Sequence, residues 1–354
     1  MYNMEEKFNK YKGNGLTGLA NLGNTCFLNS TLQCLSHTYE LNDFLNKKDS
    51  DGEKKEFETK LNAVPESLIL MEWDNLRELM WSDNCTVNPA GFVANIQKVA
   101  HIKDAVLFTG YAQNDLTEFL TFLFDCFHSA LKREFQMNIK GSVKNDMDKL
   151  AMKCYTMMRN MYKKEYSEFL KMFYGIHISC VKSYESDYTN TTPEPFFNLL
   201  IEMGPDKTLE SCIDEYTSIE KMEKDCKLYN DQSKIKENGE KRIIFWSLPD
   251  ILVITLKRFT PGRRKNKEMI DFPLEDLDLR KYIIGYNKNS YVYDLYGICN
   301  HSGGVQGGHY TSFVKNADGK WYHYNDTNVS EVRNLNSLKT PKAYCFFYRK
   351  KIQK

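Results

Sequence analysis

Residues 18–35, GLANLGNTCFLNSTLQCL, run from a turn rich in glycine and asparagine into a helix. Asn24 and Thr25 are residue types that cap helices, and the leucines at positions 28, 32 and 35 repeat at helical spacing. The pattern predicts a helix that begins at Cys26. The sulfur would then lie against the positive end of the helix, which favours the thiolate. A buried structural cysteine is the simpler alternative when Cys26 is taken alone.

The first half of the chain is dominated by helical patterns. Amphipathic or apolar periodicity predicts helices over residues 90–99 and 115–131, and a helical segment over 146–173, which contains no Pro or Gly. Residues 46–59, NKKDSDGEKKEFET, read as a solvated loop or helix end. The amino-terminal half is therefore expected to be mainly α.

The second half changes to short β-branched or aromatic runs bounded by turn residues. Strands are predicted over 176–181, 196–203, 243–247, 251–259, 291–299, 310–315, 321–325 and 343–349. Residues 219–242 are highly charged and are expected to form a protruding hairpin or loop outside the core. Helices followed by strands indicate an α+β fold, with the site in the seam between a helical lobe and a sheet lobe.

Composition narrows the class of protein. Of 354 residues, 42% are hydrophobic and 27% are charged, which excludes disordered, collagen-like and coiled-coil chains. Lys and Arg total 48 against 47 Asp and Glu, so no overall charge attracts nucleic acid or anionic lipid. No secretory signal or membrane span is visible in the sequence, and an intracellular, reducing compartment, cytoplasm or nucleus, is expected. The ten cysteines are then thiols.

A second candidate for chemistry lies far along the chain. Residues 301–311, HSGGVQGGHYT, place His309 after a glycine-rich loop, at the start of a predicted strand. A base brought beside Cys26 by the fold is what nucleophilic catalysis requires. The strand at 321–324 ends in Asn325 and Asp326, which are placed to hold the far ring nitrogen of His309, although an Asn-Asp pair is also an ordinary turn signal. Together, Cys26, His309 and the Asn325-Asp326 pair supply a thiol, an imidazole and an amide or carboxylate, the three group types that a catalytic triad combines.

These motifs resemble those of a known family. Residues 18–35 resemble the Cys box of the ubiquitin-specific proteases, and residues 301–328 resemble their His box. The same family pattern is matched by QNDLTEFL at 113–120, by LPDILVITLKRF at 248–259, by YDLYGICNHSG at 293–303 and by AYCFFYR at 343–349. The resemblance spans about residues 15–350.

The resemblance implies a papain-like cysteine protease with a hand-like architecture of helical thumb, β-sheet palm and β fingers. A single catalytic domain is expected over residues 15–350, with the thumb at about 15–172, the fingers at about 173–245 and the palm at about 246–350. Residues 1–14 are expected to be a polar amino-terminal extension, and residues 351–354 a basic tail.

The resemblance also implies roles for the candidate catalytic residues. Cys26 would be the nucleophile, His309 the general base and Asn325 the residue that orients His309. Asp326 would be a neighbouring polar support or a substitute for Asn325. Asn21 stands where the family places the amide that stabilises the oxyanion; its alternative role is to stabilise the turn.

Ubiquitin ends in a flexible Leu-Arg-Leu-Arg-Gly-Gly tail, so a protease that cuts after it needs a narrow cleft and acids for the arginines. Asp115 and Glu118 lie at i,i+3 on one predicted helix and would meet that tail, although a solvated helix face is the alternative. Gln113 is expected to bind the substrate with them. Tyr310 and the Gly303–Gly308 run, including Gly308, would form the cleft wall and a mobile blocking loop.

Many members of this family carry two Cys-x-x-Cys pairs that hold zinc at the fingertips. Here the first pair is reduced to Cys180 and Ser183, and the second is read as Cys226 and Tyr229. Two thiolates cannot close a structural zinc site, and neither Cys212 nor His177 has the chelate spacing to complete it. The sequence therefore predicts fingers without metal and an enzyme without a cofactor.

The expected function is that of a deubiquitinase, a thiol hydrolase that acts on ubiquitin or ubiquitinated proteins as a monomer, without nucleic acid or membrane. One alternative is a protease for a ubiquitin-like modifier, because diglycine tails are shared. Another is a catalytically weak scaffold that binds ubiquitin. A metal-dependent hydrolase is disfavoured, because the sequence has no H-E-x-x-H or complete ligand set.

Overall fold

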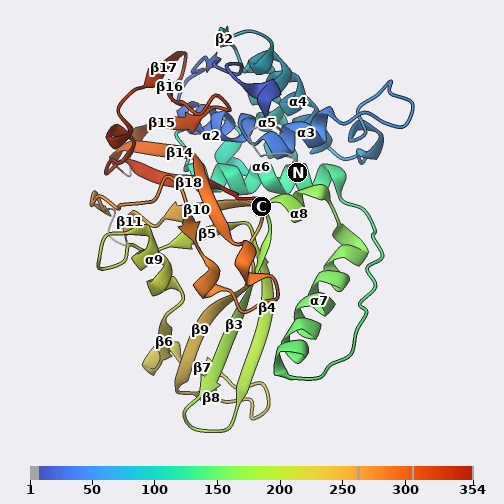
Figure 1. Ribbon diagram of the computed structural model, residues 1–354, viewed down its shortest axis with the longest axis vertical. Helices are drawn as coiled ribbons and strands as arrows, with labels where there is room; N and C mark the ends of the chain where they lie inside the picture. Colours follow the sequence, from blue (N-terminus) through green and yellow to red (C-terminus); the bar gives the residue numbers. More distant parts are fainter. Residues whose placement is uncertain (1–7, 261–263, 305–306, 353–354) are drawn as a thin grey trace.

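The computed structural model describes residues 8–260, 264–304 and 307–352. Figure 1 shows a helical lobe at the top, a large sheet against it, and long strands that extend downward beside an isolated helix. Most helices precede most strands along the chain, as the α+β prediction requires; the exceptions are the short strands β1 and β2 and helix α9.

The helical lobe is formed by the amino-terminal part of the chain together with a short helix that follows the long isolated one. Its helices are α2 (Cys26–Ser36), α3 (Tyr39–Asn46), α4 (Ser67–Ser82), α5 (Ala90–Ile102), α6 (Leu116–Leu131) and α8 (Glu168–Phe173). A parallel pair of two-residue strands, β1 (Gly18–Leu19) and β2 (Thr86–Val87), fixes the segment before α2 against the segment before α5.

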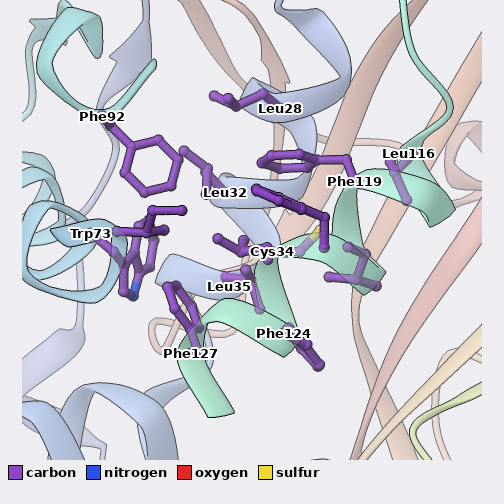
Figure 2. Packing of buried hydrophobic residues seen from close by; sticks show 14 of the residues in the cluster. Leu28, Leu32, Cys34, Leu35, Trp73, Phe92, Leu116, Phe119, Phe124 and Phe127 are labelled. Atoms are coloured by element: carbon purple, nitrogen blue, oxygen red, sulfur yellow. The ribbon is translucent and has the colours of Figure 1, made fainter. Parts of the chain in front are cut away.

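Helix α2 lies at the centre of the lobe, and all eleven of its residues are buried. Figure 2 shows Leu28, Leu32 and Leu35 among the aromatic side chains of neighbouring helices. Phe27 meets Phe119 of α6 edge to face, with ring centroids 5.3 Å apart. A helix packed on all sides has one available position, so the place of its first residue is fixed by the core.

The large sheet has eight strands in the order β17-β16-β15-β14-β18-β10-β5, with β13 paired to β14. Their bounds are β5 Asn198–Ile201, β10 Ile251–Leu256, β13 Leu277–Asp278, β14 Val292–Gly304, β15 Gly307–Lys315, β16 Trp321–Asn325, β17 Asn328–Val332 and β18 Ala343–Lys350. Helix α2 packs against β14 and β15, so the first residues of the helical core meet the last strands of the sheet. This contact forms the seam between the two lobes.

The long strands at the bottom of Figure 1 form a four-stranded sheet in the order β4-β3-β9-β6. Their bounds are β3 Gly175–Ser183, β4 Thr189–Phe196, β6 Ile219–Met222 and β9 Gly239–Ser247. Helix α7 (Asp146–Glu165) flanks this sheet, and its Ala151 and Cys154 pack with Ile176, Ile178 and Trp246. The remaining elements are helix α9 Leu209–Tyr216 and the small strands β7 Leu228–Tyr229, β8 Lys236–Glu237, β11 Phe259–Thr260 and β12 Arg264–Lys265.

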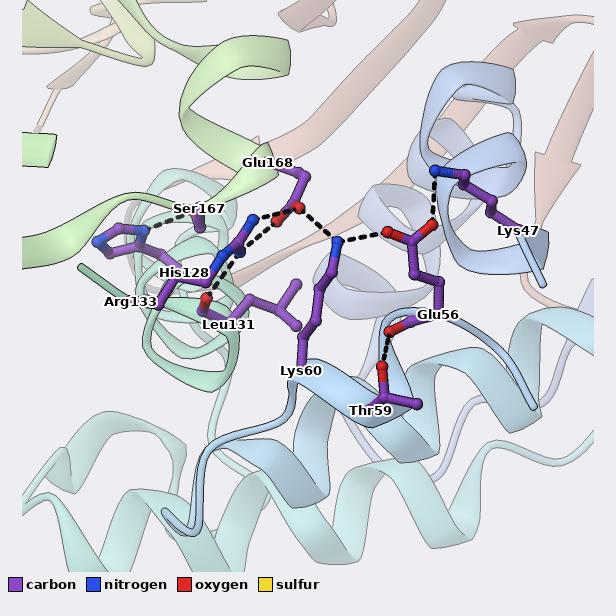
Figure 3. Close-up of polar contacts among 9 residues, drawn as sticks. All are labelled: Lys47, Glu56, Thr59, Lys60, His128, Leu131, Arg133, Ser167 and Glu168. Atoms are coloured by element: carbon purple, nitrogen blue, oxygen red, sulfur yellow. Dashed lines mark hydrogen bonds and ion pairs between the residues drawn. The ribbon is translucent and has the colours of Figure 1, made fainter. Parts of the chain in front are cut away.

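A polar network joins the ends of α6 and α8 to the surface segment at 47–60. Figure 3 shows Glu168 accepting hydrogen bonds from both Arg133 and Lys60, while Lys60 also pairs with Glu56. Glu56 in turn pairs with Lys47 at 2.6 Å. The segment read as a solvated loop is thus tied to the helical lobe by charge.

Several sequence predictions need correction. The helical segment expected over 146–173 is two helices, α7 and α8, separated at Tyr166 and Ser167. Helices α3, α4 and α9 and strand β4 were not predicted. Of the two forms expected over 219–242, a hairpin or a loop, the structure has the paired form, because β6 and the start of β9 are antiparallel partners at the edge of the four-stranded sheet.

Among the described residues, none of the helices combines the length and the apolar character that crossing a bilayer requires.

Candidate active site

Cys26 is the first residue of α2, as predicted, and only 4% of its surface is exposed. The turn before it bends through Asn24, whose φ of 57° lies in the left-handed region that Asn tolerates. The Asn24 amide donates to the carbonyl of Tyr111 at 3.0 Å, which anchors the turn to the segment before α6. The core therefore holds the thiol at the seam between the lobes.

The surroundings of Cys26 oppose the thiolate that the helix end favours. Burial raises the pKa of the thiol above its usual value, and the negative charge of Asp326 raises it further. The backbone N–H of Tyr310 acts in the opposite direction. Desolvation exceeds the helix-end effect here, so a base must take the proton of Cys26 for it to attack.

His309 directly precedes Tyr310, whose backbone N–H points at the thiol of Cys26. Both residues belong to β15, the strand against which α2 packs. The Nε2 atom of His309 lies 2.7 Å from Oδ1 of Asn325, the last residue of β16. The structure thus joins His309 to Asn325 and packs the strand of His309 against α2, the helix that begins at Cys26.

Asp326 follows Asn325 in a left-handed conformation (φ 50°), and its carboxylate points toward the turn before α2. Its Oδ2 accepts from Nδ2 of Asn21 at 2.9 Å, and its Oδ1 accepts from Nδ2 of Asn29 at 2.8 Å. No hydrogen bond joins Asp326 to His309 among the described residues. Asp326 therefore supports the turn that carries Asn21, rather than the imidazole directly.

The amide of Asn21 is fixed at both ends. Its Oδ1 accepts from the backbone N–H groups of Gly23 and Thr25, while one of its two Nδ2 hydrogens goes to Asp326. The second hydrogen of Nδ2 has no partner in the described structure. Asn21 thus has one amide hydrogen free beside the turn that leads into Cys26.

The turn before α2 and the turn after β16 touch at a glycine. A Cβ added at Gly18 would lie 2.3 Å from the carbonyl oxygen of Thr327, closer than any real contact. The backbone of Leu19 donates to the carbonyl of Asp326 at 2.9 Å. Gly18 therefore permits the close approach that places Asn21 and Asp326 in contact.

A cavity of about 200 Å³ opens at the thiol. Four of the predicted substrate-binding residues line it, namely Gln113, Asp115, Gly308 and Tyr310, whereas Glu118 does not. Phe259 and His301, for which the sequence suggested no role, also line the cavity. Gly304, Gly307 and Gly308 form part of the wall without side chains, while Val305 and Gln306, which belong to the predicted blocking loop, lie outside the described residues.

Gln113 bridges the two sides of this cavity. Its Nε2 donates to the carbonyl of Gly308 at 3.1 Å, and its Oε1 accepts from the N–H of Gly308 at 2.8 Å. The same Nε2 lies 3.3 Å from Oδ1 of Asn24. The side chain therefore connects the turn before Cys26 with the strand that carries His309.

Asp115 caps α6 and faces the large sheet. Its Oδ1 accepts from the N–H of Thr117 at 2.7 Å, and its Oδ2 accepts from the hydroxyl of Tyr344 at 2.7 Å. The carboxylate of Glu118 is exposed on the first turn of the same helix. Partial burial raises the pKa of Glu118, and the negative charge of Asp115 raises it further. The two acids predicted at i,i+3 thus have different environments.

The residues predicted as a reduced zinc site differ in their surroundings. Cys226 and Tyr229 are exposed, and Cys180 is half-buried on β3. Of the two residues considered as substitutes, Cys212 accepts from the N–H of Gly204 and His177 lies beside Glu194. Among the described residues, no group of three or more His, Cys, Asp or Glu side chains could hold a metal ion.

A carboxylate occupies the fingertip instead. Glu237, 2% exposed, accepts four side-chain hydrogen bonds: from the hydroxyls of Ser183 and Ser186 on Oε2, and from Asn230 and Ser233 on Oε1. The donors form two i,i+3 pairs, 183/186 and 230/233, the spacing of paired zinc ligands. Ser183, read from the sequence as the remnant of a zinc-ligand pair with Cys180, thus donates its hydroxyl to Glu237.

The sequence comparisons agree with one another. A family profile described as ubiquitin carboxyl-terminal hydrolase matches residues 17–348. Ubiquitin carboxyl-terminal hydrolase 2 of Bos taurus is 33% identical over 359 residues, which cover 97% of this chain and 56% of that protein. Ubiquitin carboxyl-terminal hydrolase Usp2 of Drosophila melanogaster is 34% identical over 347 residues, covering 96% of this chain and 35% of that protein. The chain thus spans about half the length or less of these relatives.

Among solved structures, the SAGA Ubp8/Sgf11/Sus1/Sgf73 DUB module bound to ubiquitin aldehyde contains a chain with the same fold. The TM-score is 0.70 at 23% sequence identity, and the match covers 97% of this chain and 71% of that one. The α+β, papain-like fold implied by the sequence motifs is confirmed by this likeness. With the profile matching nearly its whole length, this chain belongs to the ubiquitin carboxyl-terminal hydrolase family.

Proposed function

We propose that this chain is a thiol-dependent deubiquitinase that hydrolyses the isopeptide or peptide bond after the carboxyl-terminal Gly-Gly of ubiquitin. The observation that carries the proposal is that the thiol of Cys26 lies at the cavity and meets the backbone N–H of Tyr310, while the preceding residue, His309, is hydrogen-bonded to Asn325. Membership of the ubiquitin carboxyl-terminal hydrolase family supports the same reaction.

In the first step His309 acts as the general base. The Asn325 oxygen holds the hydrogen on Nε2, which leaves the lone pair on Nδ1 to accept the proton of Cys26. The sulfur then attacks the carbonyl carbon of the terminal glycine. When the carbon–nitrogen bond breaks, the proton passes from His309 to the leaving amine, and the acyl group stays on sulfur.

In the second step a water molecule attacks the thioester while His309 takes one of its protons. The carbon–sulfur bond breaks, the proton returns to the sulfur, and ubiquitin leaves with a free carboxylate. Asn21 donates the free hydrogen of its Nδ2 to the negative oxygen in both steps. Asp326 and the backbone of Thr25 hold this amide in place before the substrate arrives.

The walls of the cavity suit a diglycine. Gly304, Gly307 and Gly308 supply backbone without side chains, so an extended tail can approach closely. Gln113 and Tyr310 bind this tail beside them, and the carboxylates of Asp115 and Glu118 meet its arginines. We assign the thumb to residues 15–172, the fingers to 173–245 and the palm to 246–350, within a catalytic domain at 15–350 that acts in a reducing intracellular compartment.

The test is reaction with ubiquitin that carries an electrophile at its carboxyl terminus, in the wild type, Cys26→Ala and Asn325→Ala. We expect covalent labelling of the wild type, loss of labelling in Cys26→Ala, and slower labelling in Asn325→Ala. Absence of labelling in the wild type would favour a scaffold that binds ubiquitin without cutting. Faster labelling by a ubiquitin-like modifier with the same electrophile would favour that substrate class.

A further inference from the structure

A second cavity, of about 550 Å³, lies beside the catalytic one. Its wall includes the side chains of Lys265, Lys267, Lys342 and His301, with backbone from Ser302 and Gly303. It shares His301 and Gly304 with the catalytic cavity, so the β14–β15 hairpin separates the two. We call this second cavity the lysine pocket.

The positive charge of the lysine pocket is not neutralised by the protein. In the described part of the chain, none of its three lysines is within ion-pair distance of an acid. The acidic residues nearest in sequence are paired elsewhere, Glu268 with Lys207 and Asp271 with Lys339. Lysines on ordinary surfaces are dispersed or paired, whereas these line a common cavity.

Lys265 is fixed in the pocket by neutral partners. Its Nζ lies 2.8 Å from Nδ1 of His301 and donates to the His301 carbonyl at 2.6 Å. Because an ammonium can only donate, Nδ1 of this imidazole is unprotonated and His301 is neutral. Burial lowers the pKa of His301 to about 4, and the charge of Lys265 lowers it as well. His301 thus orients Lys265 without compensating its charge.

A buried arginine near the lysine pocket adds to its excess of positive charge. Arg258 has no exposed surface, and its hydrogen bonds go to the carbonyls of Ala343, Asn266 and Glu268 rather than to a carboxylate. Its Nη2 has no partner in the described structure. Burial lowers the pKa of Lys265 to about 8, and the charges of Arg258, Lys267 and Lys342 lower it further.

We propose that the lysine pocket binds a small anion with two or more phosphate groups. Three lysines lining one cavity repel cations and match a multivalent oxyanion. A ligand with a single carboxylate would leave most of the repulsion among the three lysines in place. Because the pocket shares a hairpin with the catalytic cavity, the anion would stabilise the strand on which His309 lies.

The experiment is a calorimetric titration of pyrophosphate into the protein at low ionic strength. The reference is a titration of chloride at the same ionic strength. We expect saturable binding at one site and at least a tenfold loss of affinity in Lys267→Gln/Lys342→Gln. Both lysines are exposed, so this variant is expected to fold. The matched control is Lys163→Gln/Lys164→Gln, which removes the same charge from exposed positions on α7 and should bind as the wild type does.

A second readout follows Lys265 itself. Acylation by an amine-reactive reagent, measured at this residue by peptide mass spectrometry across pH 7–10, should be suppressed several-fold by pyrophosphate, because an adjacent anion favours the unreactive ammonium. O-Phosphoserine, which carries one phosphate group, should protect Lys265 much less; equal protection would contradict the requirement for two or more phosphates.

Three further results would overturn the proposal. These are the absence of saturable binding, an equal loss of affinity in the control on α7, and equally tight binding of citrate, which would show that phosphate is not selected. None of these outcomes depends on deubiquitinating activity.

Discussion

Gln113 pairs with Gly308 through both ends of its side-chain amide, donating to the carbonyl at 3.1 Å and accepting from the N–H at 2.8 Å. Gly308 precedes His309, so this pairing fixes the base relative to the helical lobe. It also occupies the backbone groups that an extended peptide would use in a β-type pairing.

We predict that Gln113→Ala lowers kcat/KM by roughly thirtyfold, chiefly through kcat. Two hydrogen bonds of about 1 kcal/mol each are lost, and about 1.4 kcal/mol corresponds to a factor of ten. The measurement is the initial rate of release of a fluorophore from the carboxyl terminus of ubiquitin. Asn95→Ala, which removes an amide bonded within α5, is the control. A rise in kcat/KM would mean that Gln113 obstructs the substrate instead.

Asp326 contributes negative charge near the thiol, which raises the pKa of Cys26 after the larger effect of burial. Removing this charge in Asp326→Asn should therefore lower the pKa. The pH midpoint of iodoacetamide alkylation at Cys26, measured by mass spectrometry, is expected to move to lower pH. Glu331→Gln, on the neighbouring strand β17, should leave the midpoint in place. An upward shift in Asp326→Asn would contradict the electrostatic assignment.

Glu237 holds the fingertip through four donors, and the hydrogen bond from Ser183 is the largest of the effects that lower its pKa to about 2. We predict that Glu237→Ala lowers the melting temperature by several degrees and speeds amide exchange in β7 and β8, because four polar groups lose their acceptor. Glu223→Ala, at an exposed position nearby, is the control.

If the fingers depended on a metal ion instead, a chelator would destabilise the wild type as Glu237→Ala does. We expect no change of melting temperature on adding EDTA and no stoichiometric zinc by elemental analysis. Loss of stability with the chelator would contradict the assignment of the fingertip to the carboxylate.

His37 is fully buried, and burial lowers its pKa to about 4. In the unfolded chain its pKa is about 6.5, so the unfolded state binds a proton first as the pH falls. Neutral His37 makes its full contribution to the free energy of unfolding above pH 6.5. As the pH falls toward 4 this contribution is lost, about 3 kcal/mol in total.

The check is the free energy of unfolding by urea between pH 7 and pH 4. We expect the slope of stability against pH to be smaller in His37→Gln than in the wild type. His101→Gln, exposed on α5, should retain the slope of the wild type. Equal slopes in all three proteins would exclude His37 as the source.

Local patterns were sufficient where a motif carries its own geometry. The start of α2 at Cys26 agrees with the leucine spacing, although Thr25 makes no side-chain cap there, and the β16 ending at Asn325 follows from a turn signal. Helix α4 shows the same spacing in Leu70, Trp73 and Met80, so its sequence also contains the information that predicts a helix.

Other features depend on contacts that no local pattern contains. Strand β4 carries Pro193 and Pro195, which disfavour a strand, yet it lies at the edge of its sheet, where a missing N–H is tolerated. The links from Asp326 to Asn21 and Asn29 join residues about 300 positions apart. The Glu237 cluster assembles from Ser and Asn, residue types that suggest turns when taken singly.

The close approach at Gly18 makes the active centre sensitive to a position with no chemistry of its own. Any side chain there would push the Thr327 carbonyl away and carry Asn325 with it. A chain altered only at this glycine would keep every reactive group and still lose their alignment. An inventory of catalytic residues is therefore not enough to decide whether such a chain is active.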